Sequence, residues 1–144
     1  KEYYKSKNKG NKLLKYFLIL FLSITIVSFI FLNIYIEEIV SYFTNEDILK
    51  IISILRILLF SFVINVIEEI MVNQYMIPNG MYKEINNLRI SIVSTVLFSG
   101  LPLIYFYGII GAAYSNLISE SVGLIYVISK YNKTKKQPYK KEIF

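Results

Sequence analysis

The chain has 144 residues, of which 55% are hydrophobic and only 18% are charged, against roughly 45–50% and about 25% in an ordinary soluble domain. A soluble domain of this length buries only about 70% of its unfolded surface, and here the apolar residues come in unbroken runs. The sequence therefore predicts an all-α integral membrane protein. Cysteine and histidine are absent, which excludes disulfides, thiol nucleophiles, imidazole bases and zinc sites built from those ligands. We expect neither an enzyme nor a bound cofactor or metal ion.

The net charge of +6 is informative mainly through its placement. Six lysines precede Tyr16 and six follow Ser129. Both clusters flank apolar runs, as anionic headgroups favour, and neither forms a basic face with base-stacking aromatics. We therefore expect membrane lipids as partners and no nucleic acid. Because the chain starts at Lys1 and its first methionine is Met71, we expect a piece of a longer protein. The first apolar run is too long for a signal peptide, and no small-residue cleavage site follows it.

The first two predicted spans lie in the amino-terminal half. Residues 16–36 form a run of 21 residues without a charge, where about 20 are needed to cross the hydrocarbon. The second run is interrupted by Arg56, and we expect its helix to continue past two glutamates and to cover 51–77. The sequence Pro78-Asn79-Gly80 then ends the helix, because proline removes a donor and asparagine and glycine tolerate turn geometry.

The other two predicted spans form a tight hairpin. Residues 90–107 carry no charge, although Pro102 near their end predicts a local bend. Residues 109–129 contain one charge, Glu120, and Gly108 is the hinge between the two helices. The sequence thus predicts four transmembrane helices.

The segments outside these spans set the orientation. Lysine and arginine number six in 1–15, two in 78–89 and six in 130–144, whereas the acidic loop 37–50 has only Lys50. Fourteen basic residues thus lie on one side and one on the other. The positive-inside rule places the basic side in the cytoplasm. We expect a multi-pass protein of the bacterial inner (cytoplasmic) membrane, with both termini of this segment cytoplasmic and 37–50 extracytoplasmic.

The fourth predicted span holds the first candidate for a substrate or ion pathway. Glu120 lies about 16 Å along the helix from Ile109 and so near the bilayer midplane, where a charge costs about 2.5–3.5 kcal/mol. Asn116 shares its face. The neighbouring face carries small residues at spacings of four, which let another helix approach closely: Gly111, Ser115, Ser119 and Gly123. We expect Glu120 to face protein or a water-filled cavity, either as a pathway residue or as a carboxyl that only locks helices together.

Three charged residues of the second span are further pathway candidates. Arg56 lies roughly 7 Å inward from Ile51. It has three open roles: snorkelling outward, binding an anionic substrate, or pairing with Glu120. Glu68 and Glu69 lie near the cytoplasmic end of the span. Being adjacent, they point about 100° apart, so at most one faces a cavity. The alternative for both is a hydrated face at headgroup level.

Two stretches resemble a known family. Residues 55–81, LRILLFSFVINVIEEIMVNQYMIPNGM, resemble the third helix from the end in polysaccharide transporters of the MATE-like flippase superfamily, where a long helix ends in an Asn-Gln stretch and a Pro-Asn-Gly-like turn. Residues 107–131, YGIIGAAYSNLISESVGLIYVISKY, look like their last conserved helix, with its Tyr-Gly-x-x-Gly-Ala-Ala opening and central Ser-Glu. The resemblance covers about 13–131. Members such as the O-antigen (Wzx-like) flippases have about twelve helices in two lobes. The resemblance therefore implies the last four helices of the C-terminal lobe, with the N-terminal lobe of the same chain missing from view.

The resemblance implies a flippase that moves an undecaprenyl-diphosphate-linked oligosaccharide across the membrane by alternating access. Such a headgroup needs a hydrated cationic cavity, for which Arg56 is a suitable bidentate partner. A protonatable Glu120 would couple the cycle to protons or sodium. Two alternatives stay open. One is a MATE-type multidrug or organic-cation antiporter, which favours an acidic cavity, and the other is a non-transporting assembly module of a polysaccharide synthase complex.

Overall fold

The structure, a computed structural model, describes residues 7–44 and 47–136, and these form four long helices. The elements are α1 (Lys7–Phe43), α2 (Ile48–Met71) with its π-helical continuation η2 (Val72–Met76), α3 (Tyr82–Tyr107) and α4 (Ile109–Lys136). No strand occurs among the described residues. The prediction of an all-α chain with four helices is confirmed.

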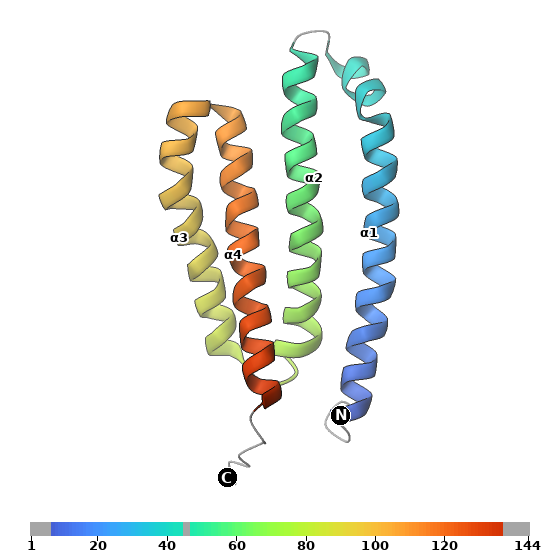
Figure 1. The fold of residues 1–144 in the computed structure, drawn as a ribbon, viewed down its shortest axis with the longest axis vertical. Helices are drawn as coiled ribbons and strands as arrows, with labels where there is room; N and C mark the ends of the chain where they lie inside the picture. Colours follow the sequence, from blue (N-terminus) through green and yellow to red (C-terminus); the bar gives the residue numbers. More distant parts are fainter. Residues whose placement is uncertain (1–6, 45–46, 137–144) are drawn as a thin grey trace.

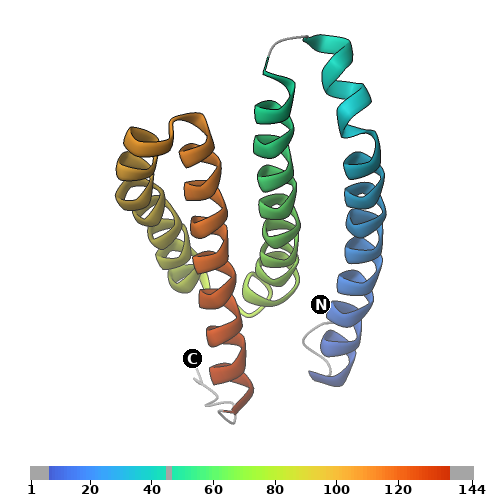
Figure 2. The ribbon, with the colours of Figure 1, turned by 45° about the horizontal axis from the view of Figure 1, so that its top comes forward.

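The helices stand side by side in the order α3, α4, α2, α1 (Figures 1 and 2). Consecutive helices run in opposite directions, so that α2 and α4, which are neighbours in space, run in the same direction. The start of α1 and the end of α4 lie at the same end of the bundle as the connection between α2 and α3. The α1–α2 and α3–α4 connections lie at the other end.

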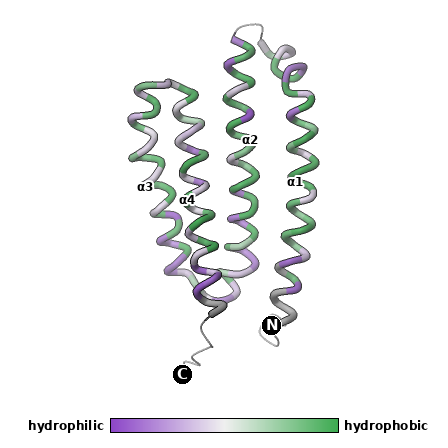
Figure 3. Tube along the Cα trace, viewed as in Figure 1, coloured by the Kyte–Doolittle hydropathy of each residue, from purple (hydrophilic) through white to green (hydrophobic). Residues whose placement is uncertain are grey.

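Three of the described helical segments are long and apolar enough to cross a membrane: Lys15–Phe43, Ile48–Met76 and Tyr82–Tyr107. Hydrophobic residues dominate the middle of the bundle, and hydrophilic ones gather where α1 begins and α4 ends (Figure 3). The 28 residues of α4 correspond to about 42 Å, a length that also suffices. Helix α4 is not among these three segments, because the polar residues in its middle lower its mean hydropathy.

The helices extend beyond the predicted spans. Helix α1 begins at Lys7 instead of residue 16 and ends at Phe43 instead of residue 36, and α3 begins at Tyr82, inside the predicted loop 78–89. Hydropathy marks where a helix enters hydrocarbon, whereas the hydrogen-bonded ladder continues into water through residues with good helix propensity, such as lysine and glutamate. Most of the predicted loops 37–50 and 78–89 are therefore helical within the described residues.

The α2–η2 helix ends where its sequence predicts, and its last turn is π-helical. The N–H of Ile77 donates to the carbonyl of Val72 at 2.9 Å, which is π-helical spacing. Asn79 Nδ2 donates to the carbonyl of Tyr75 at 2.6 Å. Gly80 has a φ of 69°, which favours glycine. The Pro-Asn-Gly sequence thus ends α2 and turns the chain into α3.

The α3–α4 hairpin is closed by glycines. Gly108 has a φ of 60°, and its N–H donates to the carbonyl of Ile104 at 2.8 Å. Three residues later, a Cβ on Gly111 would overlap the backbone carbonyl of Leu103. The two helix backbones are therefore in direct contact near the turn. Pro102 lies inside α3, which continues through it to Tyr107.

Two apolar clusters are buried. One lies near the α2–α3 turn, where Met76 and Leu88 are fully enclosed and Phe17 and Leu18 of α1 pack against the cluster. The other lies between α1 and α2 toward the opposite end and consists of Ile36, Val40 and Ile52. The region between these clusters, where α2 faces α4, is polar.

Candidate functional site

Helices α2 and α4 face each other through paired polar side chains. Asn116 Nδ2 of α4 donates to Ser61 Oγ of α2 at 2.6 Å. One turn further along, Asn65 Nδ2 of α2 donates to Glu120 Oε2 of α4 at 3.0 Å. Each pair is separated by 55 residues, because the two helices are parallel and keep a constant register.

Glu68 and Gly123 continue this register. On α2 the residues Ser61, Asn65 and Glu68 follow one another at spacings of four and three, which places them on one helix face. Their partners on α4 have the same spacing. We call these six residues the polar seam: Ser61, Asn65, Glu68, Asn116, Glu120 and Gly123. It runs through the interior of a bundle whose outer surface is apolar.

The Glu68 carboxyl fits into space that Gly123 leaves open. The residue is fully buried, with 0% exposed surface. A Cβ on Gly123 would overlap Glu68 Oε2 and would come within 2.9 Å of Ile92 Cδ1. Any larger residue at 123 would displace the carboxyl. Oε2 has no hydrogen-bond partner among the residues that the structure describes, whereas Oε1 accepts from Arg89.

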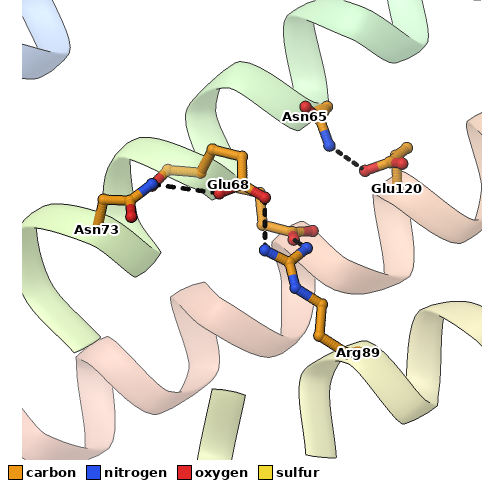
Figure 4. A network of polar contacts seen from close by, with 6 residues as sticks. Asn65, Glu68, Asn73, Arg89 and Glu120 are labelled. Carbon is orange, nitrogen blue, oxygen red and sulfur yellow. Dashed lines mark hydrogen bonds and ion pairs between the residues drawn. The ribbon is translucent and has the colours of Figure 1, made fainter. Parts of the chain in front are cut away.

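Arg89 of α3 joins two carboxylates of α2 (Figure 4). Its Nη1 donates to Glu68 Oε1 at 3.1 Å and its Nη2 donates to Glu69 Oε1 at 2.5 Å. Glu69 Oε2 also accepts from Asn73 Nδ2 at 3.2 Å. The planar fork of arginine suits two acceptors at once. This clamp connects α2 to α3. It contains two carboxylates and one guanidinium, so that acidic groups outnumber basic ones.

The small residues of α4 contact the neighbouring helices or form a hydrogen bond within α4. Gly111 lies against the α3 backbone. Ser115 Oγ lies 2.8 Å from Ser99 Oγ of α3 and 3.3 Å from the carbonyl of Val96. Ser119 is fully buried and donates to the carbonyl of Asn116 in its own helix at 2.8 Å. Both α2 and α3 can approach α4 closely because these side chains are short.

Arg56 lies apart from the seam. Its Nη2 is 3.7 Å from Glu37 Oε1 of α1, and the two side chains are 50% and 71% exposed. It stands nine residues before Asn65 on α2, about 13 Å along the helix. Glu120, the partner considered from sequence, accepts from Asn65 instead. The structure therefore does not bring Arg56 and Glu120 together.

The sequence did not identify three residues of this site: Arg89, Asn65 and Ser61. Arg89 fell in the predicted loop 78–89, and the other two lay unremarked inside an apolar run. One signal could have identified Arg89. Two adjacent glutamates inside a span require a nearby cation, and Arg89 follows Glu68 by 21 residues, on the helix that comes after a single turn. Glu68 is buried by α4, so the hydrated headgroup-level alternative does not describe it. Glu69 is 38% exposed at its side chain.

The site offers hydrogen-bonding groups and charges. Carboxylate, amide and hydroxyl groups line the seam, and the guanidinium of Arg89 lies at one end of it. In the described part of the chain, no three acidic side chains gather closely enough to hold a metal ion. The seam is suited to bind a polar ligand or ion, or to lock the helices together.

The two stretches that carry the family resemblance contribute most of this site. Residues 55–81 contain the α2 side of the seam and the π-helical turn, and 107–131 contain the α4 side and the hairpin hinge. Comparisons with protein-family models, curated proteins and solved structures found no match to this chain.

Proposed function

We propose that this chain is the carboxyl-terminal part of a MATE-like membrane transporter, and that its polar seam borders the path of the substrate or of the coupling ion. The observation that carries the proposal is the seam itself. Polar and charged side chains are costly within hydrocarbon, and where they occur they face the bundle interior or a water-filled path. Asn65, Asn116 and Glu120 are only partly buried by this chain, which leaves a polar edge for the missing lobe to cover.

In this proposal α4 is the fourth crossing, and both termini face the cytoplasm. Its polar face is covered by α2 and α3, which offsets its lower hydropathy. Support comes from the common end shared by the start of α1 and the end of α4 (Figure 1) and from the fourteen basic residues on that side. Because the chain lacks cysteine, Lys50→Cys should react only with reagent outside the cell. Labelling only from the cytoplasm would contradict this topology.

The proposed cargo is an undecaprenyl-diphosphate-linked oligosaccharide. The resemblance of 55–81 and 107–131 to polysaccharide transporters supports it. Arg56 supports it further, because its guanidinium is half exposed and its Nη2 lies 3.7 Å from Glu37 Oε1, so a diphosphate can compete for its planar fork. Arg89 is less suited, since two carboxylates already occupy it.

The acidic balance of the interior favours a second candidate, an organic-cation antiporter. Within the described part of the chain, Glu68, Glu69 and Glu120 face a single cation around the seam, Arg89. A cationic substrate would be attracted to such a site. Uptake assays with the purified full-length transporter separate the two: movement of lipid-linked oligosaccharide supports the flippase, and movement of an organic cation alone supports the antiporter. Binding of acceptor lipid or synthase subunits without any transport would support the assembly module.

The decisive experiment is complementation of polysaccharide export by the full-length transporter carrying Glu120→Gln or Arg56→Lys. The first change removes a titratable charge and keeps volume and hydrogen bonding, so that a pathway carboxyl is lost and a packing residue is tolerated. The second keeps the charge and removes the fork. Glu38→Gln, on the exposed face of α1, is the control. We expect export to fall for both test variants at normal membrane abundance, and normal export from both would contradict the roles of these residues.

The 144-residue chain alone should not transport. Alternating access requires two lobes that move against each other, and in this proposal the chain supplies only part of one lobe. Liposomes containing only these residues should leave lipid-linked oligosaccharide in its original leaflet. Translocation by the isolated chain would contradict the proposal that it is part of a larger transporter.

A further inference from the structure

One end of the bundle gathers lysines from three helices. Lys12 and Lys15 of α1, Lys83 of α3 and Lys133 of α4 are exposed there. Lys130 lies among them, with its ammonium 5.3 Å from the centre of the Tyr126 ring. Figure 3 shows this hydrophilic end where α1 begins and α4 ends.

The opposite end has the reverse charge. Among the described residues near it, two basic ones, Lys50 and Arg56, and three acidic ones, Glu37, Glu38 and Asp47, are exposed, and Arg56 already pairs with Glu37. Electrostatic attraction to an anionic surface acts within about 10 Å at 0.1 M salt. Only the lysine-bearing end can therefore be attracted to such a surface.

Tyrosines next to the lysines place them at the level of lipid headgroups. Tyr16 follows Lys15 on α1, and Tyr82 precedes Lys83 on α3. These two rings are 70% and 67% exposed. Exposed tyrosines of spanning helices lie at the boundary between hydrocarbon and headgroups, so the adjacent ammonium groups come to the depth of the lipid phosphates.

The helices themselves continue past this boundary. Helix α1 begins at Lys7, nine residues before Tyr16, and α4 continues to Lys136, beyond Lys130 and Lys133. Lys12 and Lys133 thus lie on helical extensions, and the start of α1 and the end of α4 share one end of the bundle with the α2–α3 turn (Figure 1). Positive charges from three helices are therefore brought to this end.

We propose that these lysines, here called the lysine collar (Lys12, Lys15, Lys83, Lys130 and Lys133), bind the phosphates of acidic phospholipids and give the chain a shell enriched in phosphatidylglycerol. Clusters of four to eight basic residues beside a spanning helix favour anionic lipid, with a contribution from each residue near the surface. Binding of this kind requires only that the chain lies in a bilayer. Its failure would therefore leave the transport proposal untouched, and the reverse also holds.

The test uses the 144-residue chain reconstituted in phosphatidylcholine with spin-labelled lipids. The ratio of association of labelled phosphatidylglycerol to labelled phosphatidylcholine is measured from the motionally restricted part of the spectrum. We expect a preference for phosphatidylglycerol of about threefold or more at low salt, falling toward one at about 1 M salt, where screening acts over about 3 Å.

The variant Lys12→Gln/Lys15→Gln/Lys83→Gln/Lys133→Gln should lower the ratio clearly below the wild-type value at low salt. Lys130 is left in place because of its contact with Tyr126. The matched control Lys50→Gln removes one lysine from the other end and should keep the wild-type ratio. Circular dichroism of each reconstituted variant establishes that its helices are intact.

Three results would overturn the proposal. They are a ratio near one for the wild-type chain, an unchanged ratio in the quadruple variant with intact helices, and an equal loss in Lys50→Gln. A wild-type ratio near one together with lysine-dependent binding of soluble polyglutamate would instead assign the collar to an acidic protein partner.

Discussion

The two sides of α2 are built from different kinds of contact. Toward α1 it presents branched apolar side chains, with Ile52 packed against Ile36 and Val40, and the Phe29 and Phe60 rings meet edge to face at 5.0 Å. Toward α4 and α3 it presents hydrogen-bonding groups, and the residues opposite them are small. The α1 side resembles the surrounding lipid, whereas the seam side does not.

This difference decides which contacts specify the fold in a bilayer. Lipid chains are as apolar as isoleucine, so apolar contact alone gives little preference for protein over lipid. Close backbone approach at Gly111 and hydrogen bonds such as that from Asn65 to Glu120 have no equivalent in lipid. We therefore expect α2, α3 and α4 to form the stable unit, and α1 to be the helix that separates most easily.

The largest effect is expected from Arg89→Gln. It leaves the enclosed Glu68 carboxyl without its charged partner. Breaking a buried ion pair from one side costs about 3–5 kcal/mol, and because the Arg89 side chain is 43% exposed, the loss should lie near the lower end of this range. The free energy of unfolding in bicelles, measured by steric trapping, should fall by about that amount. The double variant Glu68→Leu/Arg89→Leu should recover most of the loss, because no buried charge remains. A loss below about 1 kcal/mol in Arg89→Gln, no more than an exposed pair contributes, would mean that the pair is open to water.

Gly111→Ala should have the next largest effect. Its Cβ would overlap the Leu103 carbonyl. A backbone atom within a helix cannot move away as a side chain can, so the overlap should lower the free energy of unfolding by about 1–3 kcal/mol. The matched control is Gly100→Ala, whose Cβ would lie 3.1 Å from Ser115 Oγ. That hydroxyl can rotate, so the control should lose less in the same unfolding measurement. Equal losses at both positions would contradict the close contact of α3 and α4.

The Asn65–Glu120 hydrogen bond should contribute a smaller coupling energy. Interhelical hydrogen bonds in membranes average about 0.6 kcal/mol and reach about 1.7 kcal/mol. A double-mutant cycle with Asn65→Leu and Glu120→Leu, each of which removes the hydrogen bond, should give a value in this range. A cycle with Asn65→Leu and Ser121→Ala, which bonds within α4, is the control and should give a coupling near zero. Coupling near zero in both cycles would show that Asn65 and Glu120 do not interact.

The smallest effect is expected from Arg56→Gln. Its pair with Glu37 is exposed on both sides, and exposed ion pairs contribute about 0–1 kcal/mol. Unfolding in bicelles should therefore change little, in contrast to the same substitution at Arg89. A loss as large as that of Arg89→Gln would show that α1 is held as tightly as α3 and would remove the contrast between the two sides of α2.

The sequence was sufficient to predict the four helices and both glycine turns, because long apolar runs and Gly80 and Gly108 act locally. It misplaced the start of α3, and with it Arg89, because hydropathy does not register the hydrated ends of a helix. It left pairing with Glu120 open as one of three roles for Arg56, because spacing along a helix does not reveal which helix lies next to it. The constant register of 55 residues between α2 and α4 arises only when α4 packs between α2 and α3.

That register is the central claim, and cysteine cross-linking tests it directly because the native chain has no cysteine. A short bifunctional thiosulfonate is applied in membranes to the pair Asn65→Cys and Glu120→Cys, and to the off-register pair Asn65→Cys and Ala112→Cys, about 12 Å away along α4. Trypsin then cuts the chain at Lys83 and Arg89, which lie between α2 and α4 in the sequence. The fragments that carry α2 and α4 stay joined only if the two cysteines are cross-linked. We predict joined fragments for the first pair and separate fragments for the second, and the reverse result, or no joining in either pair, would contradict the parallel register of α2 and α4.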